Sequence, residues 1–354
     1  MTPPPLPLEI FYRIISRVTS NNDLCALALC CRTLRDEAQR RLFRHSPRHN
    51  VPQQAKFLDA MNNSLGRLGP MVASYTIDLH PFAIYASAGI PTKTVAGFAL
   101  SSMCNLSTLR ILRYAASTVL DISTLLTCAF RLTSLEFGHY IDPLLFDFLR
   151  TQPSLRHLKL HGTLRGSIPT ELLRDDLEFC PNLVSLSAEH SVLGVFLAEH
   201  RRIKHLHCGI PWHSMGDELI SVKASQLPSV EHIALRIHID QPNLSFLQNI
   251  PSLIRLDIVD HRYQQASQLF YILENTPQIR HLVLMVIPTE TVEDKVVETA
   301  RAVFKMRPAL EHVDIIYSAH GRNTFVRFYT PAKSGKMERR TLPLEDFYVG
   351  NEFV

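Results

Sequence analysis

The sequence predicts an α/β protein: three short N-terminal helices, followed by an irregular repeating array with parallel strands inside and helices outside. Three observations support this fold class. The first fifty residues contain three short segments with the apolar spacing of helices. From residue 104 onward a Leu-x-x-Leu-x-Leu pattern returns every 20 to 31 residues. Helix-like stretches lie between these copies, so each copy pairs a strand with a helix.

Size and composition fit an ordinary globular chain. The 354 residues are 46% hydrophobic and 20% charged, which excludes a disordered or collagenous protein. Seven Cys without a Cys-x-x-Cys pair are typical of small buried hydrophobic residues in a reducing compartment. No signal-peptide pattern opens the chain, and no run approaches the ~18 apolar residues of a membrane span. We therefore expect an intracellular protein, cytoplasmic and/or nuclear, without a membrane partner.

The positive charge is confined to one end of the chain. Residues 1–50 hold eight Arg and four acidic residues, and the rest of the chain is electrically balanced. A general phosphate binder needs a basic face that extends over its body. We therefore expect no nucleic-acid partner.

The N-terminal segments have helical apolar patterns and candidate caps. Pro7 and Glu9 suit the first turn of a first helix. Asp23 is a candidate cap for the second helix, and Thr33 with Asp36 resembles a capping arrangement for the third. The apolar stripe of the first helix comprises Ile10, Phe11, Ile14, Ile15 and Val18. The second and third helices use Leu24, Leu27, Ala28, Cys31, Leu34, Ala38 and Leu42.

This region resembles an F-box. The resemblance rests on LPLEIFYRIISRVTSNNDLCALALCCRTLRDEAQRRLF, within residues 5–45, although Leu42-Phe43 replaces the Trp often found near the end. The resemblance implies docking onto the Skp-type adaptor of a cullin-RING ubiquitin ligase. The resemblance also implies which residues bind that adaptor, namely those at positions that match the family motif: Leu6, Pro7, Glu9, Ile10, Ile14, Leu24, Leu27 and Leu34.

The physical argument for a partner is independent of the family. A unit of three short helices is too small to bury all of its apolar side chains, so part of its apolar face needs a partner. The alternative is that these helices only cap the array that follows, as terminal units of repeat proteins do.

The repeats resemble leucine-rich repeats over about residues 70–320. The nine copies, after a weaker VASYTI at 72, are LSTLRI at 106, LTSLEF at 132, LRHLKL at 155, LVSLSA at 183, IKHLHC at 203, VEHIAL at 230, LIRLDI at 253, IRHLVL at 279 and LEHVDI at 310. Their fourth and sixth positions are apolar and share one face of a strand. The Asn or Cys usual after the third Leu is missing, so the array should be irregular.

Helix-like stretches at 143–150, 244–250, 263–276 and 291–306 connect the copies, and Pro follows each of them. After residue 320 alternation in TFVRFYT predicts a terminal cap or hairpin. We therefore divide the chain into an F-box-like domain at 1–50, a linker helix at 51–71, the repeat array at 72–320 and the cap or hairpin at 321–354.

Histidines recur at one position of the repeat, before the second core apolar residue. They are His157, His205, His232, His281 and His312. Strands about 4.8 Å apart would align them as a stripe on one exposed surface, interrupted by Ser185 and Arg255. Zinc requires three or four converging ligands, so we favour a polar stripe and expect neither metal nor cofactor. His205 and His207 share a strand face, with no evident carboxylate partner.

No catalytic motif is present. The sequence lacks a nucleophile elbow, a phosphate-binding Gly-Lys loop, a His-Glu-x-x-His pair and a dinucleotide fingerprint. We therefore expect no enzyme, and the F-box resemblance implies the substrate-recognition subunit of a Skp-cullin-F-box ligase. Two alternatives remain, a scaffolding array with capping helices and a His-bearing metal or hydrolytic enzyme. The sequence does not assign residues that bind the target.

Overall fold

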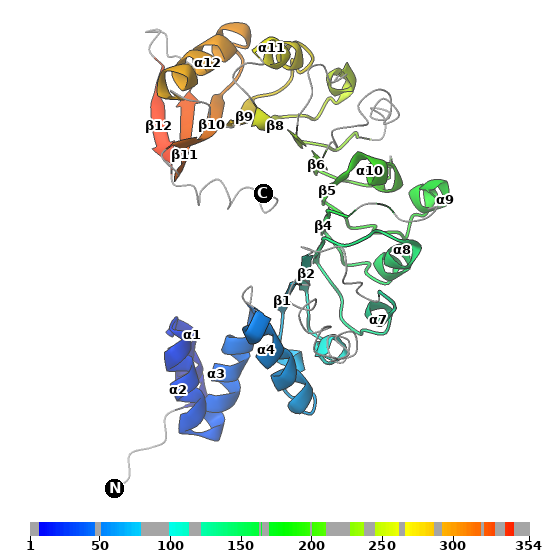
Figure 1. Ribbon diagram of the computed structural model, residues 1–354, viewed down its shortest axis with the longest axis vertical. Coiled ribbons are helices and arrows are strands. Elements are labelled where there is room, and N and C mark those ends of the chain that lie inside the picture. Colours follow the sequence, from blue (N-terminus) through cyan, green and yellow to red (C-terminus); the bar gives the residue numbers. More distant parts are fainter. Residues whose placement is uncertain are drawn as a thin grey trace. The chain divides into compact units, whose positions relative to one another are not determined.

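The computed structural model describes residues 7–46, 51–78, 99–112, 122–162, 164, 170–198, 200–209, 227–236, 245–261, 266–286, 292–319, 322–329 and 337–342. The chain divides into two compact units (Figure 1). Unit 1 comprises Met1–Leu158 with Arg165–Ile168, and unit 2 comprises Lys159–Leu164 with Pro169–Val354.

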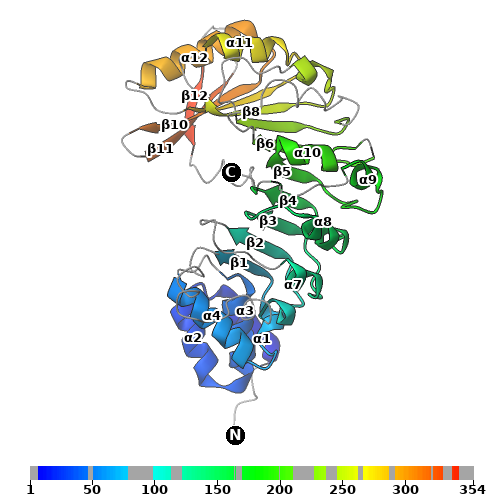
Figure 2. The ribbon, with the colours of Figure 1, turned by 45° about the vertical axis from the view of Figure 1, so that its right-hand side comes forward.

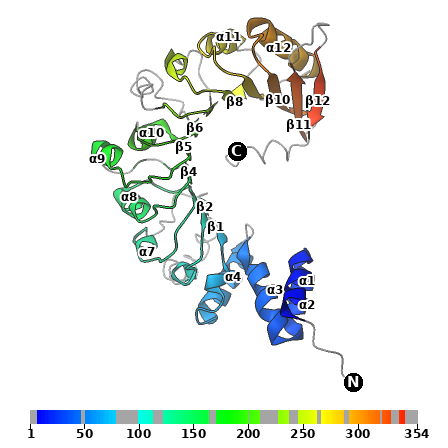
Figure 3. The same cartoon turned by 180° about the vertical axis from the view of Figure 1, so that it is seen from behind.

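Unit 1 opens with the three predicted helices, which lie side by side in opposite views (Figures 1 and 3). They are α1 Leu8–Arg17, α2 Asn21–Cys30 and α3 Arg32–Arg44. A small core holds them together, because apolar side chains at helical spacing meet between them. This core comprises Ile15, Leu24, Ala28 and Ala38, with Val18, Leu27, Leu34 and Leu42 packed against it.

Two predicted helix starts are wrong. The cap of α2 is Ser20, whose hydroxyl accepts a hydrogen bond from the backbone N–H of Asp23 at 3.3 Å. Asp23 instead lies in the first turn, where a carboxylate favours the positive end of the helix. Thr33 does not cap α3, which starts at Arg32 directly after the extended Cys31 and has no side-chain cap.

The predicted burial of cysteine is correct for only part of the chain. Cys128, Cys180 and Cys208 are buried, and burial raises the pKa of Cys128 to about 11 and those of Cys180 and Cys208 to about 12. The other four, Cys25, Cys30, Cys31 and Cys104, are exposed. Cys31 is therefore outside the buried stripe to which its spacing assigned it, because it lies in the extended link between α2 and α3.

The repeat array begins within unit 1. After α4 Val51–Asn63 and the 3-10 helix η1 Gly69–Met71 come the parallel strands β1 Ser74–Asp78, β2 Thr108–Leu112 and β3 Ser134–Phe137. The short helix α7 Ser123–Leu126 and α8 Pro143–Arg150 lie to one side of these strands (Figure 2). Asp142 caps α8 by accepting a hydrogen bond from the N–H of Leu145 at 3.1 Å.

The strand β4 His157–Leu160 lies where the two units divide. Unit 2 continues with six parallel strands in sequence order, followed by two antiparallel strands, among its described residues. They are β5 Ser185–Glu189, β6 His205–Gly209, β7 His232–Arg236, β8 Arg255–His261, β9 His281–Val286, β10 His312–Ala319, β11 Arg322–Tyr329 and β12 Arg339–Leu342. β11 pairs antiparallel with both β10 and β12 in the region where a cap or hairpin was predicted.

Helices of unit 2 cover one face of its strands (Figures 1 and 2). They are α9 Thr170–Asp175, α10 His190–Phe196, the 3-10 helix η4 Ser245–Asn249, α11 Ala266–Glu274 and α12 Val292–Met306. Each predicted strand starts at the third residue of its motif, so the fourth and sixth positions do point to one buried face. The fold is therefore an α/β array of the leucine-rich-repeat type, as predicted.

The repeats lack the usual Asn, and other polar side chains make hydrogen bonds to the backbone of neighbouring repeats. Arg201 is 2% exposed, and its guanidinium donates to the carbonyl oxygens of Val195 at 2.8 Å and Leu173 at 2.7 Å. Gln278 donates to the carbonyl oxygens of Leu247 and Ile250, both at 2.9 Å. Carbonyls at the ends of helices lack partners within the helix, so these contacts satisfy them. Different residue types do this in different repeats, consistent with the irregular repeat length.

Candidate functional site

The first candidate surface lies on α1. Ile10 and Ile14 are one turn apart and are 40% and 53% exposed. The neighbouring Ile15 is only 1% exposed and fills the small core. The apolar stripe predicted for this helix is thus wider than the contact with α2 and α3, and part of it remains on the surface.

The predicted adaptor-binding residues fall into different environments. Leu6 lies outside the described residues. Pro7, Glu9, Ile10 and Ile14 are exposed along α1. The three leucines of α2 and α3 are in the interior: Leu24 is buried, and Leu27 and Leu34 pack against the core. Ile10 and Ile14 are therefore the large apolar side chains of the predicted set that are classed as exposed among its described members.

Contacts made by α3 and the residues after it attach the three helices to the array. The backbone N–H of Ser46 donates to the carbonyl oxygen of Ser74 in β1 at 3.0 Å, and that of Ala73 donates to Arg44 at 2.9 Å. Arg67 donates to the side-chain oxygen of Gln39 in α3 at 2.6 Å. These contacts use α3 and the residues after it, and they leave Ile10 and Ile14 on the surface.

The second candidate surface is the face of the unit 2 strands opposite the buried fourth position. The register aligns the third motif positions of β6 to β10, which are His205, His232, Arg255, His281 and His312, and it pairs His312 with Tyr329 at the end of β11. The predicted row of histidines interrupted by arginine is confirmed. The row is half-buried and not fully exposed, because the side chains of His232, His281 and His312 are 13%, 30% and 17% exposed.

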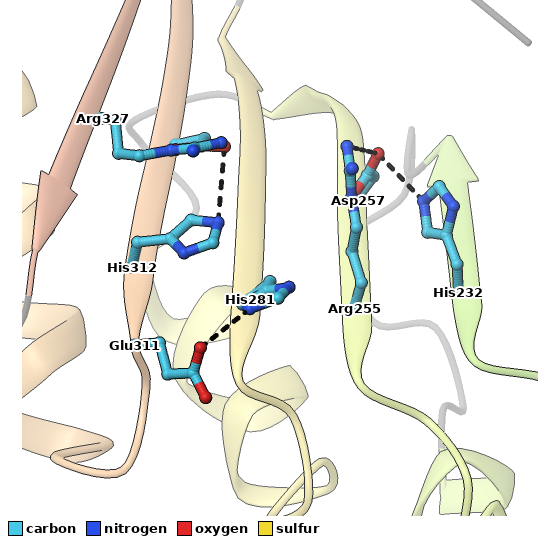
Figure 4. Close-up of polar contacts among 8 residues, drawn as sticks. His232, Arg255, Asp257, His281, Glu311, His312 and Arg327 are labelled. Carbon is cyan, nitrogen blue, oxygen red and sulfur yellow. Dashed lines mark hydrogen bonds and ion pairs between the residues drawn. The ribbon is translucent and has the colours of Figure 1, made fainter. Parts of the chain in front are cut away.

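A buried carboxylate lies beside this row on β8. The two oxygens of Asp257 accept hydrogen bonds from Nε and Nη2 of Arg255 at 2.8 and 2.9 Å, and Nε2 of His232 lies 3.0 Å from Oδ2 (Figure 4). Burial raises the pKa of Asp257, but the contacts with His232 and Arg255 outweigh burial. Its pKa therefore lies below the ordinary value, and the group is ionised near neutral pH.

The same arrangement recurs on β10 and β11. Asp314 accepts two hydrogen bonds from Nε and Nη2 of Arg327, each at 2.7 Å, and Nε2 of His312 lies 3.8 Å from Oδ2 of Asp314. Burial lowers the pKa of His312 to about 4, although Asp314 opposes this shift. His312 is therefore neutral near pH 7, and the Asp314–Arg327 pair is the charged part of this group.

His281 extends the second group and is aligned with Arg255 of the first group in the strand register. Its ring stacks on that of His312 with centroids 4.2 Å apart, and its Nε2 lies 3.2 Å from Oε2 of Glu311 (Figure 4). The contact with His281 lowers the pKa of the exposed Glu311. Arg280 also reaches Glu311, at 3.5 Å. The result is two polar groups on one face, His232–Arg255–Asp257 on β7 and β8 and His281–Glu311–His312–Asp314–Arg327 on β9 to β11, which we call the polar network.

The sequence reasoning missed Asp257 and Asp314. Both occupy the fifth position of their motifs, and side chains two residues apart share a strand face, so each lies on the face of the histidine row. This spacing is the signal that could have located them. Within the described part of the chain, no three His, Cys, Asp or Glu side chains form a group suited to a metal ion.

Comparisons with known proteins find only distant structural similarities to this chain. No family model matches the sequence, and no curated protein matches it. Among solved structures, the TLR13–ssRNA13 complex is similar over 73% of this chain and 35% of that one, with 14% identity and a TM-score of 0.40. A Bacteroides fragilis protein is similar over 77% of this chain and 73% of that one, with 13% identity and a TM-score of 0.39. This chain thus spans about a third of the TLR13 chain.

The helices of the described residues are too short or too polar to cross a membrane. The architecture itself defines the class of protein. Stacked strand-and-helix units with one helix-free face are typical of arrays that bind other proteins.

Proposed function

We propose that this chain is the substrate-recognition subunit of a Skp-cullin-F-box ubiquitin ligase. In this proposal α1 to α3 bind a Skp-type adaptor, which connects the chain to a cullin, and the repeat array binds the target protein. The chain is not an enzyme. It acts by raising the effective concentration of a lysine of the target near a ubiquitin-conjugating enzyme carried by the partners. The proposal implies an intracellular location.

The observation that carries this proposal is the surface of α1. Ile10 and Ile14 are exposed although their neighbour Ile15 is buried, so α1 has apolar side chains that the three-helix core does not use. Contact with a partner would remove this apolar surface from water. The same residues belong to the segment that resembles an F-box, which supports a Skp-type adaptor as that partner.

A scaffolding array with capping helices is the second candidate function. It is favoured by the backbone hydrogen bonds of Ser46 and Ala73, which join the end of α3 to β1. Capping through α3 gives no role to the exposed side chains of α1. Capping and adaptor binding therefore use different surfaces and are compatible, and the exposed side chains of α1 favour an adaptor in addition to capping.

Binding of the full chain to a purified Skp-type adaptor tests the proposal by calorimetry. Ile14→Asp places a charge on the exposed face of α1 and should weaken binding by about 2 kcal/mol or more. The matched control is Leu144→Asp on α8, because Leu144 is 42% exposed and lies outside the three helices. Equal adaptor binding by wild type and Ile14→Asp, or no binding by wild type, would contradict the proposal.

A further inference from the structure

We propose that the helix-free face of β7 to β11 binds an acidic segment of the target protein, with Arg255 and Arg327 as its anion-binding side chains. The identity of the partner as a recruited target rests on the proposed function. The binding chemistry rests on the polar network itself.

The two ion pairs are asymmetric in exposure. The side chains of Asp257 and Asp314 are 4% and 3% exposed, whereas those of Arg255 and Arg327 are 24% and 29% exposed. The carboxylates thus lie beneath the surface, and the guanidinium groups reach it. A ligand that approaches this face meets the positive member of each pair first.

The buried carboxylates also fix the orientation of the guanidinium groups. Each Asp accepts from Nε and Nη2 of its Arg, and an Arg side chain has five N–H groups, so further N–H groups remain beyond the carboxylate contact, although Arg327 also makes a side-chain hydrogen bond with Tyr329. Because the fork is already held, little side-chain entropy is lost when it binds an anion. Guanidinium groups bind carboxylate and phosphate oxygens with matching geometry.

The surface between the two arginines carries no competing exposed carboxylate among its described aligned residues. The rings of His281 and His312 lie there, stacked on each other. The nearby Glu311 is exposed, but it pairs with Arg280 at 3.5 Å and lies 3.2 Å from Nε2 of His281. Charge complementarity therefore favours an acidic segment over a basic one.

The strand register sets the spacing of the acidic groups. Arg255 lies on β8 and Arg327 on β11, three strands away, which corresponds to about 14 Å between the two sites. An extended chain advances roughly 3.3 to 3.6 Å per residue, so two acidic residues about four positions apart would reach both sites. The expected ligand is an extended segment with this spacing, and its anions are carboxylates or phosphates.

Labelled peptides titrated with the full-length protein test the inference by fluorescence anisotropy. A Gly-Ser peptide carries two Asp, two phosphoserine, two Asn or two Lys residues four positions apart. We expect the Asp peptide, the phosphoserine peptide or both to bind, with affinity that falls as salt increases, and the Asn and Lys peptides to bind more weakly. The tighter acidic peptide identifies the anion. The inference is overturned if neither acidic peptide binds better than the Asn peptide.

Paired substitutions locate the binding site. Arg255→Gln with Asp257→Asn, and Arg327→Gln with Asp314→Asn, each remove one cation and one anion without leaving a buried carboxylate. We expect each pair to weaken binding of the acidic peptide about tenfold, the equivalent of one charge-assisted hydrogen bond. Arg150→Gln with Asp147→Asn is the control, since it removes an exposed ion pair on α8. Melting temperatures show whether each variant is folded. Unchanged affinity for the acidic peptide in both folded test variants overturns the inference.

If neither paired variant folds, Arg327→Lys keeps the charge and removes the planar fork, and the expected result is weaker binding of the acidic peptide. Affinity equal to wild type then overturns the inference.

The adaptor measurement separates this inference from the proposed function. Ile14→Asp should lose the adaptor and keep the peptide, and the paired variants should do the reverse. Peptide binding without any adaptor binding would reject the ligase proposal alone.

Discussion

Apolar side chains are usually buried and charged side chains are usually exposed, and each candidate surface breaks one of these two rules. On α1, Ile10 and Ile14 are apolar and exposed. On β8 and β10, Asp257 and Asp314 are charged and buried. Charged groups are rarely buried unless they are paired, and apolar patches are rarely exposed unless they bind something.

The two surfaces differ in whether the chain itself offsets the unfavourable environment of the side chain. Each buried carboxylate is paired with an Arg of the same unit, so the charge is compensated within the chain. The exposed side chains of α1 have no such compensation in the three-helix core. Substitutions of the exposed side chains of α1 should therefore affect binding more than stability, whereas those in the polar network should affect stability strongly.

The largest expected effect is on the small core beneath the α1 surface. Ile15→Ala removes a side chain that is 1% exposed from a core of few residues. We expect a loss of about 3 to 4 kcal/mol in the free energy of unfolding of the helical segment, from lost burial and the cavity left behind. Hydrogen exchange of α1 to α3 measures it. Unchanged exchange would mean that Ile15 is not a core residue.

The next effect concerns a buried carboxylate without its cation. Arg255→Gln leaves Asp257 buried and without its two-pronged partner, and we expect a loss of about 3 kcal/mol in the free energy of unfolding. Denaturant unfolding measures this loss. Adding Asp257→Asn should recover a large part of it. If Arg255→Gln is as stable as wild type, the carboxylate is not compensated in the way described.

A smaller effect should appear in the pH dependence of unit 2. Burial lowers the pKa of His312 from 6.5 to about 4, so the folded chain binds fewer protons than the unfolded chain between these values. The stability from neutral His312 is complete above pH 6.5 and declines as pH falls toward 4, by about 2 kcal/mol. Asp314 raises this pKa, while Arg327, His281 and Arg255 lower it.

His312→Asn should remove this part of the pH dependence. Thermal unfolding of wild type and variant between pH 7 and pH 4 provides the comparison. The contribution of Asp257, whose pKa is lowered from 3.8, begins to fall at about pH 5 and is lost mainly below 3.8, and it is common to both chains, so the difference between them isolates His312. Equal slopes for both chains would show that His312 titrates normally.

The smallest expected effect is on stability at the α1 surface. Ile14→Ala truncates a side chain that is 53% exposed, and we expect a change of under about 0.5 kcal/mol in the free energy of unfolding. The same substitution should weaken adaptor binding. A stability loss comparable to that of Ile15→Ala would mean that Ile14 packs within the chain, and the contrast between the two regions would fail.

Repeat spacing predicted the strands well because each copy has to present its fourth and sixth residues to the same core. All copies from LSTLRI to LEHVDI form a strand that begins at its third residue, and Pro143–Arg150 is a helix with the predicted bounds. Helix caps were less predictable. Ser20, Asp23, Thr33 and Asp36 are all plausible caps by residue type, and only the backbone path decides which one accepts a hydrogen bond.

The sites were predicted in part. Helical spacing assigns Ile10, Ile14 and Ile15 to one stripe, but it does not say where the small core ends and the exposed part begins. The histidine row followed from the repeat, yet its pairing with Asp257 and Asp314 depends on strand register across neighbouring copies. Burial and pKa shifts arise from these contacts between strands, and a single repeat contains no record of them.

Hydrogen exchange of the full chain with and without a Skp-type adaptor tests the central claim most directly. The account predicts slower exchange in Leu8–Arg17 when the adaptor is present, and unchanged exchange in Val292–Met306. Slower exchange confined to the repeat array, or none anywhere at saturating adaptor, would contradict it.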